Sequence, residues 1–459
     1  MPTIAERLAD WAASLRFEDL PPAVVHEVKR HVLDSLGCAL GAWLADPCVI
    51  ARRVAMRLSA NPGAMLLGTK HIAPPDWAAF SNGCMVRYLD YNDTYLSLEP
   101  AHPSDNIPAA LAVAQAHKAN GKALIVAIAL AYEIQCRLCD AASIRARGWD
   151  HVTYGAFSVA LAAGKLMGLS ADQLRHAVGI AGVGSANLRQ SRVGELSHWK
   201  GCAFASAAQH GVQAAMLAAE GMTGPAPIFE GQHGFEKLVS GPLHLGGPFA
   251  EEPGNHSSGD FMIMRTSIKY WPAEYHSQSA IEAALELRRE ITDIEAIEAV
   301  SIESHDAAVD IIGSGAERWR PTSRETADHS LPYIVAVALI DGEITASQFE
   351  ESRFTEPKLL NLLSRVSVTR NAELSQRYPK EVGNIVKVKL RDGRTLEHRV
   401  DTPLGNAARP LSDAQLQAKY LSQADAVLDA ERANLLAQWV MRLEQQQSID
   451  ELFSLAEVR

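Results

Sequence analysis

IVKVKLRDGRTLEHRV, residues 385–400, shows most clearly that this chain is not helical throughout. Apolar and polar residues alternate over 385–390, Asp392 and Gly393 follow, and a second extended run covers 395–400. An Asp-Gly pair between two such runs is a strong hairpin signal, because the turn requires residues that accept positive φ. The segment therefore predicts two antiparallel strands, with positive φ at both Asp392 and Gly393.

The residues around this hairpin predict a small α+β unit. Alternating apolar positions at 296–304 and 365–369 indicate further strands. Helical patterns at 331–339 and 356–363 lie between them. Strands that alternate with helices in this way are typical of an α+β domain. We expect this unit to cover residues 266–401.

The rest of the chain is predicted to be helical. Leu33, Leu36 and their neighbours show the three- and four-residue spacing of a buried helical face. Small residues are frequent over 156–219, which favours helices that pack closely. Helical spacing returns after the hairpin. The fold class is therefore mainly α: a large all-helical domain, residues 1–265 together with 402–459, carries the smaller inserted α+β domain as a lid.

Length and composition indicate a soluble globular protein of two domains. At 459 residues the chain exceeds what one core usually supports, and its 47% hydrophobic and 21% charged residues are typical of a globular protein. Its net charge of −11 argues against a nucleic-acid partner, although an acidic protein can contain a small basic pocket for an anion. The first residues lack the pattern of a secretory signal, and the most apolar run, 123–132, is too short to span a bilayer. We expect a cytoplasmic protein with no membrane or nucleic-acid partner.

The usual cofactor motifs do not occur in the sequence. It contains no GxGxxG dinucleotide loop, Walker A lysine, HExxH or GxSxG segment. Cys136 and Cys139 have the spacing of a redox or metal pair, but they lie in a predicted helix without a second pair or a nearby histidine. An iron–sulfur cluster needs three or four grouped thiolates. The sequence therefore favours chemistry that uses neither a metal nor another cofactor.

Four polar segments stand at predicted helix entrances or at the domain junction. The first, residues 88–105, combines carboxylates, a threonine and a histidine ahead of a helix, whose free N–H groups favour an anion. The others cover 148–155, 197–201 with the preceding run 187–192, and 269–276, and the last lies where the two domains meet. A polar surface loop explains the first segment equally well, with residues 104–105 as the cap of the following helix.

Six segments in this order resemble the MmgE/PrpD family. They are LDYNDTY…AHPSD (89–105), GWDHVTYGAF…AAGKLMGL (148–169), GELSHWKG (194–201), GMTGPAPIFEGQHGF (221–235), KYWPAEYHSQSA (269–280) and RETADHSLPYIVAVALIDG (324–342). The likeness covers nearly the whole chain and implies a helical domain with a smaller α+β lid, an active site between them and a homodimer. Asp150-His151-Val152 and the GELSHWKG run are most similar to the 2-methylcitrate dehydratase branch of the family.

The resemblance implies a lyase that removes water from 2-methylcitrate, giving 2-methyl-cis-aconitate, by side-chain acid/base catalysis without a cofactor. Decarboxylation of cis-aconitate and epimerisation of a dicarboxylate are alternatives on the same scaffold, and a helical scaffold without activity is a third. The residues implied as catalytic are Asp90, His102 and His151. Those implied as substrate-binding are Thr94, Lys200, Lys269 and His276.

Histidine suits the proton transfers of such a reaction. Because imidazole titrates near neutral pH, His102 and His151 are candidates for the base that removes the C–H proton and the acid that protonates the leaving oxygen, in either order. Asp90 is expected to orient one of these two imidazoles or to hold its protonated form.

A tricarboxylate also requires fixed positive charge. Lys200 and Lys269 are the candidates for this charge, with Arg189 or Arg192 as weaker ones. A cation beside the carboxylate on which charge builds stabilises the transition state. The prediction is a cavity in which basic side chains surround a pair of histidines.

Overall fold

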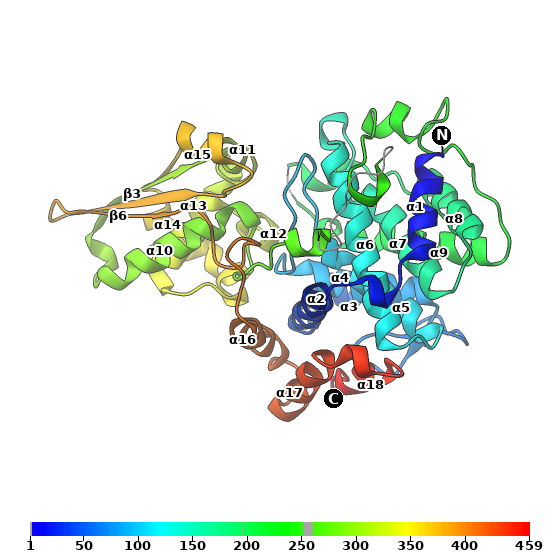
Figure 1. Cartoon of the computed structure of the whole chain (residues 1–459). Coiled ribbons are helices and arrows are strands. Elements are labelled where there is room, and N and C mark those ends of the chain that lie inside the picture. The colour runs from blue at the N-terminus through cyan, green and yellow to red at the C-terminus, as the bar shows by residue number, and fades with distance from the viewer. Residues whose placement is uncertain (1, 195, 251–259) are drawn as a thin grey trace.

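The computed structural model describes residues 2–194, 196–250 and 260–459. In these residues the protein has two lobes, a larger helical lobe and a smaller sheet lobe built around four strands (Figure 1). Both ends of the chain lie on the helical lobe, although the chain passes through the sheet lobe between them. The mainly α fold expected from the sequence is confirmed.

The helical lobe combines helices from both ends of the chain, because α16 packs against α2 and brings the last helices to it. A short ribbon of β1 (Ala64–Met65) and β2 (Ile72–Ala73) lies on this lobe. Its helices are α1 (Ile4–Ser14), α2 (Pro22–Gly41), α3 (Asp46–Ala55), α4 (Pro75–Tyr88), α5 (Ile107–Ala116), α6 (Gly121–Ala141), α7 (Val152–Leu166), α8 (Ala171–Gly184), α9 (Trp199–Ala219), α16 (Asp413–Ala424), α17 (Ala430–Val440) and α18 (Asp450–Leu455).

Small residues bring the central helices of this lobe close together. An added Cβ at Gly211 in α9 would lie 2.9 Å from the carbonyl oxygen of Ala156 in α7. One at Gly83 in α4 would lie 2.9 Å from the Cβ of Ala205 in α9. Larger side chains would separate the helices, because protein interiors have no spare space. The close packing expected for residues 156–219 is confirmed, and it fixes three helices whose ends carry predicted site residues.

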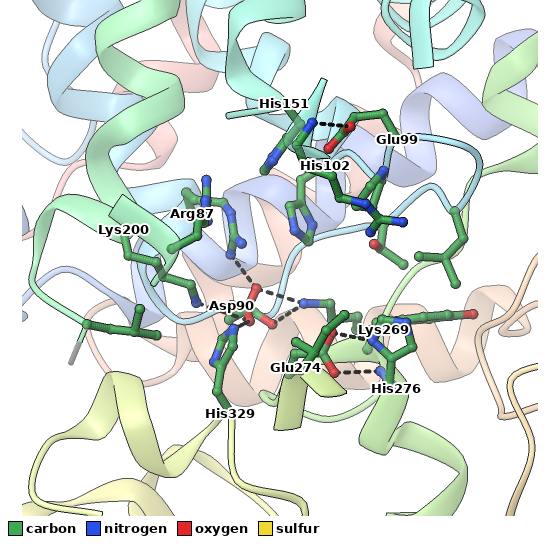
Figure 2. Close-up of a pocket in the computed structure, with 18 of the residues that line it drawn as sticks. Arg87, Asp90, Glu99, His102, His151, Lys200, Lys269, Glu274, His276 and His329 are labelled. Carbon is green, nitrogen blue, oxygen red and sulfur yellow. Dashed lines mark hydrogen bonds and ion pairs between the residues drawn. The ribbon is translucent and has the colours of Figure 1, made fainter. Parts of the chain in front are cut away.

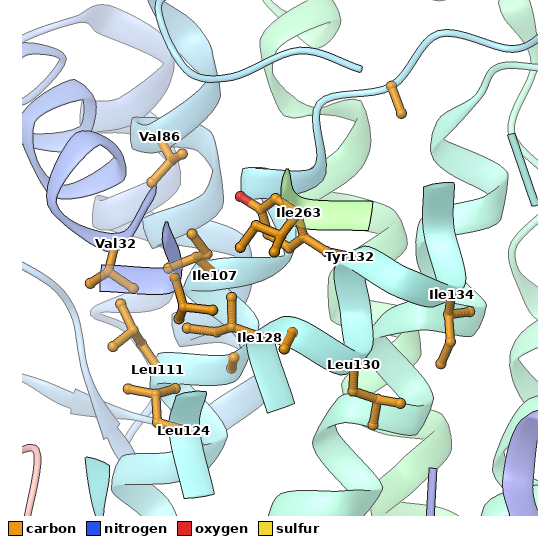
Figure 3. Close-up of a cluster of buried hydrophobic side chains, with 14 of the residues drawn as sticks. Val32, Val86, Ile107, Leu111, Leu124, Ile128, Leu130, Tyr132, Ile134 and Ile263 are labelled. Atoms are coloured by element: carbon orange, nitrogen blue, oxygen red, sulfur yellow. The ribbon is translucent and has the colours of Figure 1, made fainter. Parts of the chain in front are cut away.

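A buried apolar layer holds α2, α5 and α6 together (Figure 3). Val32, Ile107 and Ile128 in this layer have no exposed surface. Full burial of one such side chain contributes about 1.5–3 kcal/mol to stability. Tyr132 of α6 belongs to the same layer, and its hydroxyl group donates to the loop that follows α4. The core of the helical lobe thus supports that loop directly.

The sheet lobe has the strand order β4–β3–β5–β6, in which β3 and β4 are parallel and the other neighbours antiparallel. Leu287 of α10, Ile334 of α13 and Val386 of β5 share its apolar core. The predicted strands are confirmed to within a residue. The elements are α10 (Gln278–Glu290), β3 (Ile297–Ser304), α11 (Asp306–Ile312), α12 (Arg324–Ala327), α13 (Leu331–Asp341), α14 (Pro357–Leu363), β4 (Val366–Arg370), α15 (Ala372–Arg377), β5 (Asn384–Leu390) and β6 (Thr395–Val400).

The predicted hairpin is present, but the prediction of positive φ at Asp392 in its turn is wrong. β5 and β6 pair antiparallel, with Val388 opposite Leu396. The amide of Gly393 donates to the carbonyl oxygen of Leu390 at 3.0 Å, and Gly393 has a φ of +91°. Asp392 does not have positive φ, because a turn closed in this way needs only its last residue in the left-handed region.

The buried apolar side chains of the two lobes form separate clusters. The largest cluster draws its residues from 4–268 and from 411–456, whereas the cluster of the sheet lobe draws its residues from 271–400. The helical lobe is therefore built from two separate parts of the chain. The domain limits expected at 265/266 and 401/402 stay predictions.

No single helix in the described ranges is long and apolar enough to span a membrane. Of the described helices, only α2 and α3 taken together reach the length and apolar composition of a span. These two helices are bent by 97° at their junction. Much of α2 is buried in the helical lobe.

Candidate active site

A cavity of about 130 Å³ lies where the helical lobe meets the sheet lobe (Figure 2). Its walls come from the loop after α4, from the segments before α7 and α9, and from the part of the chain that enters the sheet lobe. The structure brings every predicted site residue to this cavity. These lining residues are Asp90, Thr94, His102, His151, Lys200, Lys269 and His276.

Asp90 lies in a cationic cluster on one side of the cavity (Figure 2). Its Oδ1 accepts a hydrogen bond from Lys269 Nζ at 2.8 Å, and its Oδ2 lies 3.2 Å from Lys200 Nζ and 3.4 Å from His329 Nε2. Arg87 also binds this carboxylate. Burial would raise the pKa of Asp90, but Arg87, Lys200 and Lys269 outweigh it and hold this pKa well below its usual range. Three cations thus surround the carboxylate of Asp90, and Arg87 also lies 3.8 Å from Asp105 Oδ2.

The backbone of Asp90 is held as firmly as its side chain. Its φ is +51°, in the left-handed region that few residues other than glycine adopt. Lys269 Nζ donates to the Asp90 carbonyl oxygen at 2.8 Å, and the Asp90 amide donates to the Arg87 carbonyl oxygen at 3.1 Å. Such a conformation persists where the surroundings fix it. The turn after α4 thus aims the carboxylate into the cationic cluster.

The partners of Asp90 correct one expectation. We expected Asp90 to orient one of the two predicted catalytic histidines, but the imidazole beside it is that of His329. The carboxylate faces the arginine and the lysines because charge-assisted hydrogen bonds are stronger than bonds to a neutral ring. Lys200 and Lys269 already bind Asp90, so a substrate carboxylate would have to share them. Burial lowers the pKa of Lys200, an effect that Asp90 opposes.

His102 is a neutral ring with one unprotonated nitrogen. Its Nδ1 donates to the carbonyl oxygen of Asp93 at 2.6 Å. Because a carbonyl oxygen can only accept, the ring carries its hydrogen on Nδ1 and keeps a lone pair on Nε2. Burial holds the pKa of His102 well below its usual value, and Arg87 and Lys269 act in the same direction. The centre of this ring lies 5.8 Å from that of His151.

The residue that fixes this ring, Asp93, is itself fixed by buried donors. Its Oδ1 accepts from the amide and the hydroxyl of Ser104 at 3.0 and 2.6 Å, and its Oδ2 accepts from the Tyr132 hydroxyl at 2.7 Å. His31 Nδ1 lies 3.0 Å from the same Oδ2. Burial would lower the pKa of His31, but Asp93 and Glu27 raise it to about 9. A protonated histidine and three neutral donors therefore hold the residue whose carbonyl oxygen fixes the His102 ring.

Ser104 and Asp105 do not cap α5, which corrects a second expectation. They lie in a 3₁₀ turn, Pro103–Asn106, and α5 begins at Ile107 without a side-chain cap. Asp105 Oδ1 accepts a hydrogen bond from Asn92 Nδ2 at 2.8 Å, and burial raises the pKa of Asp105 to about 7. Both side chains are used by neighbours in the loop, so this loop is a buried support of the cavity and not a surface cap.

His151 is oriented by its neighbour in the chain. Its Nδ1 lies 2.8 Å from Asp150 Oδ1, while Asp150 Oδ2 accepts from Arg192 Nε at 2.9 Å and from the Ser191 hydroxyl at 2.7 Å. The Nε2 atom has no hydrogen-bond partner among the described residues. Burial lowers the pKa of His151, and Asp150 opposes this effect. A carboxylate on Nδ1 stabilises the imidazolium once the ring takes up a proton.

Thr94 joins the loop after α4 to the segment that enters the sheet lobe. Its amide donates to the Ser267 carbonyl oxygen at 2.8 Å, and the Ser267 amide donates back at 2.9 Å. The Thr94 hydroxyl donates to the carbonyl oxygen of Ala101 at 3.3 Å. This residue therefore fixes the spacing between Asp90 and Lys269, which lie on the two joined segments.

His276 stands on the sheet-lobe side and is held on both ring nitrogens. Its Nδ1 lies 2.6 Å from Glu274 Oε1, and its Nε2 lies 3.3 Å from the Tyr378 hydroxyl oxygen. Burial would raise the pKa of Glu274, but His276 lowers it to about 2. The imidazole and its partners therefore form a fixed part of the cavity wall.

The sequence patterns did not identify several residues that line the cavity. Arg87 lies within an ordinary helical pattern, which gives no signal of a site. His329 belongs to the RETADHS segment, where the resemblance alone did not single it out. Glu274 stands two residues before His276, so it could have been chosen as a carboxylate near a histidine. Arg145 is also part of the wall.

One group of described side chains is close enough to hold a metal ion. The ligand atoms of Asp90, Asp328 and His329 lie within 4.8 Å of one another. However, Lys200 and Lys269 already bind Asp90, and their charge opposes a divalent cation. The donor set fits a metal poorly because the Asp90 carboxylate is committed to ion pairs.

Two family profiles together match most of the chain. That of the MmgE/PrpD N-terminal domain matches residues 6–246, and that of the MmgE/PrpD C-terminal domain matches residues 271–445. The chain belongs to the MmgE/PrpD family. The membership that the sequence motifs predicted is confirmed.

Relatives in the MmgE/PrpD family carry two different names. A 2-methylcitrate dehydratase of Cupriavidus necator is 30% identical over 421 residues, which cover 85% of this chain and 84% of that protein. A probable 2-methylcitrate dehydratase of Saccharomyces cerevisiae is also 30% identical, over 82% of this chain and 77% of that protein. The cis-aconitate decarboxylase of Homo sapiens is 27% identical over 96% of this chain and 92% of that protein.

Proposed function

We propose that this MmgE/PrpD protein is a lyase that removes water from a tricarboxylate, with 2-methylcitrate as substrate and 2-methyl-cis-aconitate as product. Relatives named 2-methylcitrate dehydratase, at 30% identity, support this reaction class. The observation that carries the proposal is the pair of His102 and His151 beside the cationic cluster of Asp90. The centres of the two imidazole rings lie 5.8 Å apart. Two proton-transfer groups next to a cluster of three cations suit the removal of a proton and a hydroxide from an anion.

His102 is the base in this mechanism. Its Nε2 takes the proton from the carbon beside a carboxylate, and its low pKa keeps this nitrogen unprotonated near neutral pH. The electron pair of the broken C–H bond forms the new C=C bond as the C–O bond breaks. Charge builds on the adjacent carboxylate during this step, and Arg87, Lys200 and Lys269 stabilise it.

His151 is the acid. A bound trianion raises the pKa of this histidine, because nearby negative charge favours the imidazolium, and Asp150 favours the same form. Nε2 of His151 then gives its proton to the leaving oxygen, which departs as water. One proton is taken from carbon and one is given to oxygen, so the overall change is the loss of one water molecule.

Decarboxylation of cis-aconitate is the second candidate. The human cis-aconitate decarboxylase matches 96% of this chain, a larger share than the 85% matched by the dehydratase of Cupriavidus necator. The same cationic cluster would stabilise the carbanion that carbon dioxide leaves behind, and one histidine would protonate it. Epimerisation of a dicarboxylate stays a prediction.

Incubation of the purified protein with 2-methylcitrate, citrate and cis-aconitate tests the proposal. We expect the ultraviolet absorbance of a conjugated alkene to appear with 2-methylcitrate and to be lost in the variant His102→Asn. The matched control is His210→Asn, which changes an exposed histidine of α9. If cis-aconitate gives carbon dioxide and itaconate while 2-methylcitrate gives no alkene, the protein is a decarboxylase and not a dehydratase.

A further inference from the structure

A second basic wall of the cavity is separate from the cationic cluster of Asp90. Arg145 and Arg189, the arginine pair, both line the cavity. They lie on the side of Glu99, whose Oε2 accepts the amide of Arg145 at 3.0 Å. Within residues 2–194, 196–250 and 260–459, neither guanidinium group has an acidic partner within 4.0 Å, whereas the neighbouring Arg192 is paired with Asp150.

The arginine pair stands on a rigid frame. Backbone hydrogen bonds of 2.9 and 2.8 Å join the segments 145–151 and 187–192, so the two 3₁₀ turns that carry the arginines are fixed side by side. Glu99 Oε2 also accepts the amide of Ile144 at 2.7 Å and the Ser143 hydroxyl at 2.9 Å. A frame that is ordered before binding reduces the entropy lost when a ligand is bound.

The charges of this wall favour an anion. Burial lowers the pKa of Arg189, and Arg145 lowers it further, because two guanidinium groups close together repel each other. Glu99 raises the pKa of Arg189 more than Arg145 lowers it, and three donors bind its Oε2, so one negative charge stands against the two positive charges of the pair. A carboxylate placed between the arginines would remove their repulsion and could accept forked hydrogen bonds from both.

We propose that Arg145 and Arg189 form a subsite for a substrate carboxylate that takes no part in proton transfer, so that the cavity selects tricarboxylates over dicarboxylates. This inference rests on the proposed function, because it concerns the same cavity. In Figure 2 the His102 ring lies between the carboxylates of Asp90 and Glu99. A substrate whose reacting carbon is at His102 would therefore extend one arm toward the cationic cluster and another toward the arginine pair.

Equilibrium binding of tricarballylate and succinate, measured by calorimetry, tests the subsite. Both probes lack the hydroxyl group and so bind without dehydration, and succinate lacks one carboxylate-bearing arm. We expect Arg189→Gln and Arg145→Gln each to weaken tricarballylate binding about 10- to 100-fold, as for the loss of hydrogen bonds between charged groups. Succinate binding should change less than about threefold. The matched control is Arg147→Gln, which changes an exposed arginine in the 3₁₀ turn that carries Arg145. This variant should leave the affinities for both probes unchanged.

Three results would overturn the subsite: equal losses for both probes, unchanged tricarballylate affinity in both variants, or a wild-type protein that does not bind tricarballylate. Thermal unfolding checks the fold of each variant, and either variant alone decides the outcome if the other does not fold. The alkene assay separates the two proposals. Selective tricarballylate binding without alkene formation would refute dehydration alone, whereas alkene formation with unchanged affinities would refute the subsite alone.

Discussion

The histidines of the cavity are held differently by the two lobes. Among the described residues, His102 and His151 of the helical lobe each use only Nδ1, on a carbonyl oxygen and a carboxylate respectively. On the sheet-lobe side His276 uses both nitrogens, on Glu274 and Tyr378. A ring with one free nitrogen can exchange a proton with a substrate, whereas a ring held at both nitrogens mainly shapes the wall. Under the proposed function, proton transfer therefore belongs to His102 and His151 of the helical lobe, whereas His276 shapes the wall on the sheet-lobe side.

The largest effect is expected for His102→Asn. The new amide can still donate to the Asp93 carbonyl oxygen, but it cannot act as a base. We expect kcat for alkene formation to fall about 10²- to 10⁴-fold, with a smaller change in KM, in steady-state assays. A fall of less than about tenfold would show that another group takes the proton.

Asp150→Asn should reduce kcat about 10- to 100-fold, because the imidazolium of His151 loses its countercharge. Ser191→Ala is the matched control, since it removes a 2.7 Å hydrogen bond to the same carboxylate but leaves its charge. We expect that control to change kcat less than about threefold. Equal effects of the two substitutions would mean that Asp150 supports the fold and not the proton transfer.

His31 extends the comparison to a histidine that stays protonated. Its pKa is raised from 6.5 to about 9 in the folded protein, so its contribution to stability is fully present below pH 6.5 and is lost as the pH rises through 9. Between pH 7 and pH 9 this loss amounts to about 2 kcal/mol. Urea denaturation should show a smaller loss over this range for His31→Gln than for the wild type. Equal losses of unfolding free energy in the two proteins would mean that a group other than His31 causes the pH dependence.

The smallest effect is expected for His276→Asn. We expect KM to rise up to about tenfold, because the wall loses its fixed shape, and kcat to stay within about threefold. Substrate saturation curves of the variant give both values. A fall in kcat as large as that of His102→Asn would remove the contrast between the lobes.

Much of the fold could be predicted because periodicity is a local property of the sequence. The alternation over 385–390 and the extended run over 395–400 predicted β5 and β6, and regular spacing predicted the helices. The backbone of Asp392 could not be predicted, because several hairpin turns accept an Asp-Gly pair and differ in φ. The parallel pairing of β3 with β4 is likewise a contact between distant segments that no local pattern encodes.

For the candidate site, too, local motifs predicted which residues take part but not how they contact one another. The motifs supplied the seven predicted residues, but the partners of these residues depend on tertiary contacts. Lys269 binds Asp90 across 179 positions of the chain, and Arg87 lies in an ordinary helical pattern. Ser104 has the residue type of a helix cap, and only the fold shows that it donates to Asp93 instead. The homodimer, the cytoplasmic location and the absence of a cofactor stay predictions.

The proton transfer assigned to His102 is tested most directly by hydrogen exchange at carbon. When the enzyme hydrates 2-methyl-cis-aconitate in deuterium oxide, nuclear magnetic resonance of the 2-methylcitrate should show one deuterium on the carbon beside the carboxylate. We predict that His102→Asn slows this incorporation at least about 100-fold, whereas His276→Asn slows it less than about tenfold. Incorporation at the wild-type rate in His102→Asn would contradict the mechanism.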